Sequence, residues 1–359
     1  MEKKSTIGLY IHIPFCAAKC DYCDFLSFAN AEDKWDSYCK ALVNELSNYT
    51  SQDAIDSIFI GGGTPTVWST NHLDNLLQAL PQTVPGAEIT CEANPGTLNE
   101  EKIAVLFARG VNRISLGLQA WQPHLLKAIG RKDSFFIESF KALRQAGFIN
   151  INVDLMFALP EQTMADWKET LDQLIALQPE HISAYGLTLE ENTPLYSRFD
   201  DFDESLDRQM YHYCKGFLQE HGYAQYELSN FCKPGFESIH NLRYWKRKPY
   251  IGFGLGAHSF DNSKRWHNTT DIEEYLSGDY IKQDIVTITD EDALAESIFL
   301  GLRMSKGVKL NDEINKAQAH RAWIEKMKAD GLLIEENSHI FLSDRGMDLA
   351  NIVMAGFVQ

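Results

Sequence analysis

The sequence predicts an α/β protein that consists of a partial (βα)6 barrel of the TIM type and a smaller, mainly helical C-terminal domain. Short apolar segments alternate with amphipathic helical segments as far as about residue 221, which is typical of a parallel sheet built by right-handed crossovers. From about residue 285 this alternation gives way to helices and two short strands. We therefore divide the chain into a partial barrel (1–222), an irregular region that closes the barrel (223–284) and a helical domain (285–359).

The six strand–helix units are expected in direct succession along the chain. The strands should cover 7–13, 55–60, 87–92, 112–118, 149–155 and 181–187, and the helices after them 35–46, 71–80, 99–109, 134–147, 164–177 and 204–221. Apolar residues recur in these helices at three- and four-residue intervals, which gives each helix one face to bury. Residues 190–204 are rich in Glu, Asp and Asn and are expected to form a loop.

The strands differ in character on their two faces. From Ile114 to Gln119 apolar residues alternate with polar or small ones, and the third, fifth and sixth strands show the same alternation. Parallel strands that are covered on both faces usually consist of continuous apolar residues. A closed eight-stranded barrel fills its lumen with branched side chains. We therefore expect helices on one face only and an open barrel with a polar, ligand-holding lumen.

The C-terminal domain is predicted to contain helices at 290–305, 311–316 and 319–330, strands at 331–335 and 339–343, and a last helix at 345–357. Helices followed by a two-stranded wing resemble a winged helix, a fold that often binds DNA. Residues 290–359 carry 12 acidic against 8 basic side chains, which disfavours a role in contacting phosphates. We interpret this domain as a lid or a docking module.

Composition limits the possible functions. The 359 residues are 44% hydrophobic and 23% charged, as in ordinary globular proteins. The net charge of −17 argues against a nucleic-acid partner, because non-specific nucleic-acid binding needs a basic surface. No run approaches the roughly 18 apolar residues of a transmembrane helix. Four of the seven cysteines are scattered and form no disulfide framework, which predicts a reducing, cytoplasmic location.

Cys16, Cys20 and Cys23 follow the first strand with the spacing C-x3-C-x2-C. A four-iron cube has four corners, so three thiolates leave one iron open. The pattern therefore fits a [4Fe–4S] cluster whose open iron binds the amino and carboxylate groups of S-adenosylmethionine. The alternatives are a zinc site or a disulfide pair, but a closed zinc site needs four ligands and no second pair of cysteines follows.

Two further motifs follow predicted strands. The three glycines of GGGTPT (61–66) would let backbone approach a ligand closely, although a tight turn explains a glycine run equally well. Glu92 ends the third strand on the polar face, where a buried carboxylate needs a partner such as an ammonium or a ribose hydroxyl. A capping or salt-bridge role is the alternative for Glu92.

The cysteine spacing, with Tyr22 before the last cysteine, resembles the radical S-adenosylmethionine superfamily. Within it, the motifs YIHIPFC, GGGTP, CEANP, LGLQ, GRKD and VDLMFALPEQT resemble the oxygen-independent coproporphyrinogen III oxidases and their relatives, over nearly the whole chain. The resemblance implies that three residues bind the cluster: Cys16, Cys20 and Cys23. It implies that the cluster-bound S-adenosylmethionine is contacted by Tyr10, Gly62 and Glu92. The positions that hold a second S-adenosylmethionine in the oxidases correspond here to Tyr22, Gly63, Thr64, Gln119, Arg131 and Asp154.

Two departures separate the chain from the oxidases. Phe25 stands where the oxidases have a fourth cysteine, and only a few residues precede Tyr10. The HemW-type heme chaperones share both departures, and HNLRYW (240–245) matches their H-N-x-x-Y-W signature. The resemblance implies heme as a ligand, with His240 offering an imidazole to the iron and Tyr244 and Trp245 offering flat surface to the porphyrin. Cys232, His258 and His267 are fallback ligands whose default interpretation is structural.

These observations leave three candidate functions for the protein. The first is a heme chaperone that delivers heme to acceptor hemoproteins, membrane-attached ones among them. The second is a coproporphyrinogen III oxidase that uses a 5′-deoxyadenosyl radical. The third, radical modification of tRNA, is disfavoured by the acidity of the chain. Phe25, the short N-terminal segment and HNLRYW favour the chaperone over the oxidase.

Overall fold

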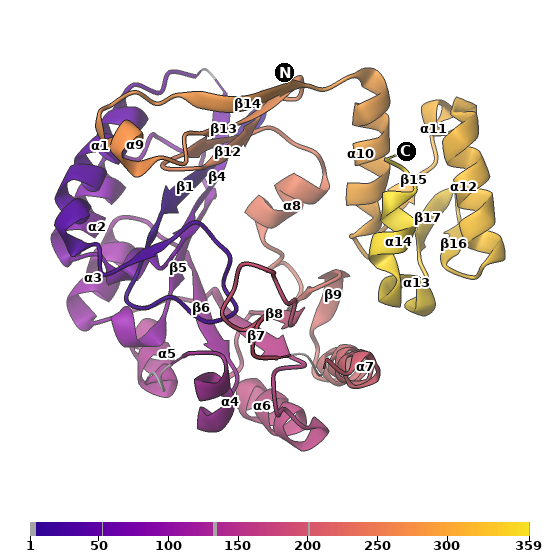
Figure 1. The fold of residues 1–359 in the computed structure, drawn as a ribbon, viewed down its shortest axis with the longest axis horizontal. Helices are drawn as coiled ribbons and strands as arrows, with labels where there is room; N and C mark the ends of the chain where they lie inside the picture. The colour runs from indigo at the N-terminus through magenta and orange to yellow at the C-terminus, as the bar shows by residue number, and fades with distance from the viewer. Residues whose placement is uncertain (1–4, 52, 132–134, 200–201, 359) are drawn as a thin grey trace.

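A computed structural model describes residues 5–51, 53–131, 135–199 and 202–358, and its centre is a curved parallel sheet (Figure 1). Six strands of this sheet lie side by side in chain order: β1 (Thr6–Ile13), β4 (Ala54–Gly62), β5 (Glu88–Ala93), β6 (Arg113–Gln119), β7 (Ile151–Phe157) and β8 (His181–Gly186). All neighbouring pairs among them are parallel. The prediction of a partial (βα)6 barrel is confirmed.

The predicted helices follow the strands and cover the outer face of the sheet (Figure 1). They are α1 (Trp35–Ser47), α2 (Thr70–Gln78), α3 (Glu100–Ala108), α5 (Phe136–Gln145), α6 (Met164–Leu177) and α7 (Glu204–Glu220). The predicted start of α5 at residue 134, and residues 200–201 of the predicted loop, lie outside the described residues. The short helix α4 (Pro123–Ala128) was not predicted.

Local capping explains where the helices begin. Thr163 accepts a hydrogen bond from the Asp166 backbone N–H, and the Asp166 carboxylate accepts one from the Thr163 backbone N–H, so a capping box starts α6. Asp203 accepts a hydrogen bond from the Leu206 N–H at the start of α7. These polar residues occur directly before apolar periodic segments, which is why the sequence pattern located both helices.

The prediction that residues 223–284 are irregular is wrong, because this region extends the sheet on both sides. It contains β9 (Ala224–Glu227), β10 (Asn230–Cys232), α8 (Ile239–Trp245), β11 (Tyr250–Phe253), β12 (His258–Phe260), β13 (Lys264–Asn268), α9 (Ile272–Leu276) and β14 (Lys282–Thr287). The resulting sheet has the order β14-β13-β12-β11-β1-β4-β5-β6-β7-β8-β10-β9. Strands of three to six residues are too short to show a clear alternation of apolar and polar residues.

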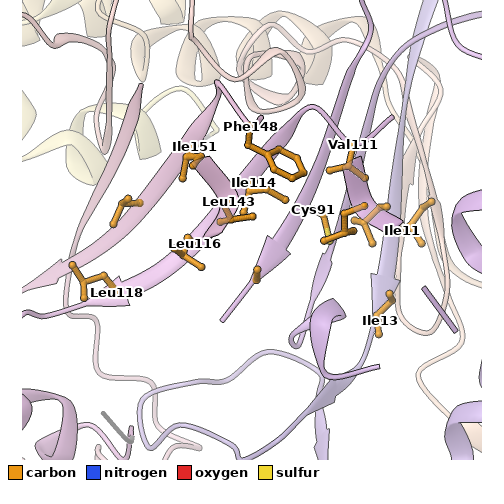
Figure 2. Packing of buried hydrophobic residues seen from close by; sticks show 14 of the residues in the cluster. Ile11, Ile13, Cys91, Val111, Ile114, Leu116, Leu118, Leu143, Phe148 and Ile151 are labelled. Atoms are coloured by element: carbon orange, nitrogen blue, oxygen red, sulfur yellow. The ribbon is translucent and has the colours of Figure 1, made fainter. Parts of the chain in front are cut away.

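The two faces of the barrel strands differ as predicted. Figure 2 shows Ile114, Leu116 and Ile151 packed with Leu143 and Phe148 from the covering layer, and all five are buried. The alternate residues on the same strands face the lumen, where several of them line a cavity. The hydrophobic core therefore lies between the sheet and its outer helices, and the inner face is free to be polar.

The C-terminal domain packs against the open side of the barrel (Figure 1). It contains α10 (Asp290–Leu302), β15 (Val308–Lys309), α11 (Asp312–Lys316), α12 (Gln318–Ala329), β16 (Leu333–Glu336), β17 (His339–Leu342), α13 (Asp344–Asp348) and α14 (Ala350–Ala355). Its sheet has three strands, because β15 pairs with β17. The single helix expected at 345–357 is interrupted at Leu349. The resemblance to a winged helix stays a prediction.

Ion pairs join this domain to the rest of the chain. Glu296 of α10 accepts hydrogen bonds from Arg247 (2.7 Å) and Arg265 (3.0 Å), and Arg303 after α10 contacts Glu227 (3.3 Å). Glu227 and Glu296 are buried, so these contacts replace the hydration that both carboxylates lose. Among the residues described, no helix is long and apolar enough to span a membrane.

Candidate cluster and cofactor site

The cysteine loop lies at the carboxyl ends of the barrel strands. Pro14 ends β1, and β2 (Phe15–Cys16) then pairs with β3 (Phe28–Ala29), which closes the base of the loop. Cys16, Cys20 and Cys23 are free, partly exposed thiols that line one cavity. The cavity encloses about 1210 Å³, including its open mouth. The structure thus brings the three predicted cluster ligands to one site.

The two alternatives for these cysteines find no support. A closed zinc site needs four ligands, and among the described residues neither a fourth cysteine nor a histidine lines the cavity beside the three thiols. All seven cysteines are free, so there is no disulfide pair. Burial, and the proximity of the thiols to one another, raise the pKa values of Cys16 and Cys23. A cationic iron cluster would offset both effects by stabilising thiolates.

The glycine run is required by close packing against the cysteine loop. A Cβ atom on Gly63 would lie 2.5 Å from the Phe15 carbonyl oxygen and 2.9 Å from Cys16 Sγ. Gly62 has a φ of +113°, and a Cβ there would meet the His12 ring at 2.6 Å. The loop therefore tolerates only glycine at these two positions, and both glycines line the cavity.

Glu92 lies deep in the cavity beside the glycine loop. The Gly62 backbone N–H donates a hydrogen bond to Glu92 Oε2 (3.1 Å). Burial and, to a smaller extent, the nearby Asp154 carboxyl together raise the pKa of Glu92 to about 8, against the opposing effects of the Gly62 N–H and Arg113. A capping role for Glu92 is excluded by this position, and no side-chain cation pairs with it in the described structure.

Asp154 faces Glu92 from β7 and is held by neutral donors. Ser115 Oγ (3.0 Å) and Asn152 Nδ2 (2.8 Å) both donate to its carboxylate. Asn152 Oδ1 in turn accepts from His181 Nδ1 (2.6 Å), which fixes the orientation of the Asn152 amide. Burial raises the pKa of Asp154 as well. Two partly buried acids that pair with no side-chain cation among the described residues make this cavity suited to a positively charged ligand.

Gln119 shows backbone strain at the cavity wall. It is buried and has a φ of +64°, a backbone conformation that residues other than glycine rarely adopt. Its Oε1 atom is buried and accepts no hydrogen bond from the residues that the structure describes. A strained residue with an unsatisfied acceptor at a cavity is typical of a binding position.

Asn94 is a site residue that the sequence interpretation missed. Its Nδ2 donates to Thr64 Oγ1 (2.8 Å), and its Oδ1 accepts from Arg131 Nη2 (2.9 Å). It thereby joins the glycine loop to Arg131, whose Nη1 lies 3.9 Å from Cys20 Sγ. The signal was present, because Asn94 follows Glu92 by two residues at the end of β5, on the same face.

Most residues predicted to contact S-adenosylmethionine line this one cavity: Tyr22, Gly62, Gly63, Thr64, Glu92, Gln119, Arg131 and Asp154. Tyr10 does not line it. Its hydroxyl instead bonds His12 Nδ1 (3.0 Å), and its ring stacks on Phe59. Ser115 of β6 and Tyr185 of β8 also line the cavity.

The heme residues lie elsewhere. His240 is fully buried on α8, which lies between the barrel strands and α10 (Figure 1). Its Nδ1 bonds Ser57 Oγ (3.1 Å) and its Nε2 bonds the Tyr244 hydroxyl (2.9 Å), so both nitrogens are satisfied. Burial lowers the pKa of His240 to about 3. Iron ligation by His240 stays a prediction and would require both hydrogen bonds to break.

The other expected heme residues are also held by protein contacts. Trp245 packs against the Arg303 guanidinium at 4.2 Å from its ring centroid. Cys232 is buried in β10. His258 is exposed, and His267 pairs with Asp284 (3.0 Å). None of these residues lines the cluster cavity.

The fold and the cavity define a class of protein. Residues 10–174 match the Radical SAM superfamily and residues 288–349 match the HemN C-terminal domain. A solved structure of coproporphyrinogen III oxidase (HemN) from Escherichia coli superposes with a TM-score of 0.87, at 20% identity, and covers 99% of this chain and 90% of that one. The protein is therefore a radical SAM protein with a HemN-type C-terminal domain.

Comparison with known sequences identifies the family within this class. The chain is 35% identical to "Heme chaperone HemW" of Bacillus subtilis, over 97% of this chain and 98% of that protein. The Lactococcus lactis relative of the same name is 35% identical over 97% and 96%, and the Escherichia coli one 38% identical over 81% of each chain. The chain belongs to the HemW heme chaperone family.

Proposed function

We propose that this protein is a heme chaperone that holds a [4Fe–4S] cluster and S-adenosylmethionine, binds heme and transfers it to an acceptor hemoprotein. The observation that carries the proposal is the 35% identity to a named heme chaperone across 97% of the chain. Phe25 supports it, since this residue stands where the oxidases have a fourth thiol. The acidity of the chain disfavours a nucleic-acid partner, and we place the protein in the cytoplasm.

Cys16, Cys20 and Cys23 would hold the cluster, which supplies one-electron reduction of S-adenosylmethionine when both are bound. Glu92 and Asp154 would face the positively charged parts of S-adenosylmethionine, its ammonium and its sulfonium. Gly62 and Gly63 leave room for the ligand beside Cys16. Gln119 Oε1 offers an acceptor that has no hydrogen-bond partner among the described residues.

The test is anaerobic reconstitution with iron and sulfide, followed by incubation with heme and, in a separate sample, with coproporphyrinogen III. We expect stoichiometric heme binding, read from the Soret absorbance, and transfer of that heme to an apo-hemoprotein. Decarboxylated porphyrin in the second sample would instead identify an oxidase. Absence of heme binding by reconstituted protein would contradict the chaperone function.

A further inference from the structure

Arg131 brings a positive charge to one of the three cluster cysteines. Its Nη1 lies 3.9 Å from Cys20 Sγ, within reach of a hydrogen bond to sulfur. Its Nη2 donates to Asn94 Oδ1 (2.9 Å) and to the Gly117 carbonyl oxygen (3.4 Å). In the described part of the chain these partners are neutral groups and a thiol, and the ion pairs there involve other cations. The guanidinium charge is therefore directed at Cys20.

The backbone holds Arg131 against the cysteine loop. The Asp21 N–H donates a hydrogen bond to the Ile129 carbonyl oxygen (3.1 Å), which ties the segment before Arg131 to this loop. Gly130 has a φ of +72°, and a Cβ atom there would lie 2.5 Å from the carboxyl carbon of Asp21. The left-handed backbone and the close approach both favour glycine. Gly130 thus lets the chain pass close enough for the next side chain to reach Cys20.

Asn94 holds the guanidinium in place without neutralising it. Its Nδ2 donates to Thr64 Oγ1 (2.8 Å), so the amide is oriented with its oxygen towards Arg131. Thr64 Oγ1 in turn donates to Cys16 Sγ (3.9 Å). An amide oxygen accepts a hydrogen bond and carries no net charge, whereas a carboxylate at the same place would cancel the charge of Arg131. Asn94 is therefore a positioning residue for this cation.

A cation at this place favours the reduced state of an iron–sulfur cluster. Three thiolates outweigh the charge of the oxidised core by one unit, and reduction adds one further negative charge. A nearby positive charge therefore stabilises the reduced state more than the oxidised state. Hydrogen bonds to cluster sulfurs are among the factors that set the potential. Arg131 is partly buried, so solvent screens its charge less than that of an exposed side chain.

We propose that the Arg131 guanidinium, positioned by Asn94, contacts Cys20 and raises the reduction potential of the iron–sulfur cluster. The inference rests on the proposed function, because it requires the cluster that Cys16, Cys20 and Cys23 would hold. It gives Arg131 a role that is separate from contact with a second S-adenosylmethionine. In the step concerned, a chemical reductant such as dithionite donates one electron to the cluster, and no bond forms or breaks.

The experiment is a redox titration of the anaerobically reconstituted full-length protein, followed by the electron paramagnetic resonance signal of the reduced cluster. Arg131→Gln should make reduction about tenfold less favourable, which lowers the midpoint potential by about 59 mV for one electron. Arg131→Lys keeps the charge but loses the planar fork of donors, so its potential should lie between the two. No S-adenosylmethionine is added, so a shift cannot come from a lost S-adenosylmethionine site.

Two further variants test the charge separately from the fold. In Asn94→Asp the new carboxylate should pair with Arg131 and cancel its charge, so the potential should fall although the arginine is retained. Lys19→Gln is the matched control, because it removes an equal charge from an exposed position in the cysteine loop. Solvent screens that charge, so the reduction equilibrium should change less than about twofold.

Iron content separates the possible failures. A wild-type potential in Arg131→Gln and Asn94→Asp at full iron content would overturn the role of Arg131 and leave the cluster and the chaperone function intact. Equal shifts in Arg131→Gln and Lys19→Gln would also overturn it, because the contact with Cys20 would then matter no more than an exposed charge. Failure of wild-type protein to assemble a cluster would instead overturn the proposed function.

Discussion

At the scale of single residues, the cavity is distinguished by Glu92 and Asp154, two partly buried acids that pair with no side-chain cation in the described part of the chain. The pKa of Glu92 is about 8 because the side chain is buried and lies near Asp154. A carboxyl whose pKa is raised by folding stabilises the protein at low pH, and this contribution is lost as the pH rises towards 8. A bound cation reverses this preference by favouring the ionised form.

We therefore predict that S-adenosylmethionine binding releases a proton. Below about pH 8 the affinity should rise by up to about tenfold per pH unit, and above it the affinity should level off. Isothermal titration calorimetry in two buffers of different ionisation enthalpy measures the proton count directly. Glu92→Gln should bind more weakly and show a smaller proton release. A wild-type affinity that is independent of pH between about 6 and 8 would refute this assignment.

Arg113 is the cation that moderates these acids. It is 1% exposed at the start of β6, one lumen-facing position before Ser115, and no carboxylate pairs with it in the described structure. Its charge lowers the pKa values of Glu92 and Asp154. An unpaired buried guanidinium is costly unless its charge is used.

Replacing this charge should shift the titration of the cavity. In Arg113→Met the ionised form of Glu92 loses a favourable interaction, so the plateau of S-adenosylmethionine affinity should move above pH 8. Arg113→Lys keeps the charge and should keep the plateau near its wild-type position. A purely structural role for Arg113 would lower the melting temperature of both variants without moving the plateau.

At the scale of elements, the sequence indicated the barrel units because each strand has two chemically distinct faces and each helix an apolar stripe. It located the three thiols, the glycine loop and Glu92 because all of these follow predicted strands. The environment of His240 could not be predicted from the residues next to it in the sequence. Ser57 bonds its side chain and Glu88 accepts from its backbone N–H, and both lie more than 150 residues away in the sequence. The short strands β9 to β14 were missed for want of periodicity.

The packing of the glycine loop yields a test at this scale. Gly63→Ala would place a methyl group 2.5 Å from the Phe15 carbonyl oxygen and 2.9 Å from Cys16 Sγ. We expect this variant to fold but to incorporate much less iron. Gly216→Ala is the control, because nothing lies within 4 Å of a Cβ at that position in α7. Alanine there should leave iron content unchanged and stabilise the helix by about 1 kcal/mol. Full iron incorporation by Gly63→Ala would contradict the tight loop.

At the scale of the whole molecule, the C-terminal domain contributes no residue to the lining of the cluster cavity. Deleting residues 285–359 should therefore leave the cluster in place and impair heme binding and transfer. Because Arg303 neutralises the buried Glu227, the deletion should be combined with Glu227→Gln to avoid an unpaired buried charge. Iron content and heme titration distinguish the outcomes, and loss of the cluster would refute the assignment of separate roles.

The whole account depends on three thiols that hold a cluster with one open iron beside the acidic cavity. Electron paramagnetic resonance of the reduced, reconstituted protein, with and without S-adenosylmethionine and alongside an iron determination, tests this most directly. We predict about four irons per chain and a [4Fe–4S] signal that changes when S-adenosylmethionine is added. A lower iron count, or a four-iron signal that saturating S-adenosylmethionine leaves unchanged, would contradict it.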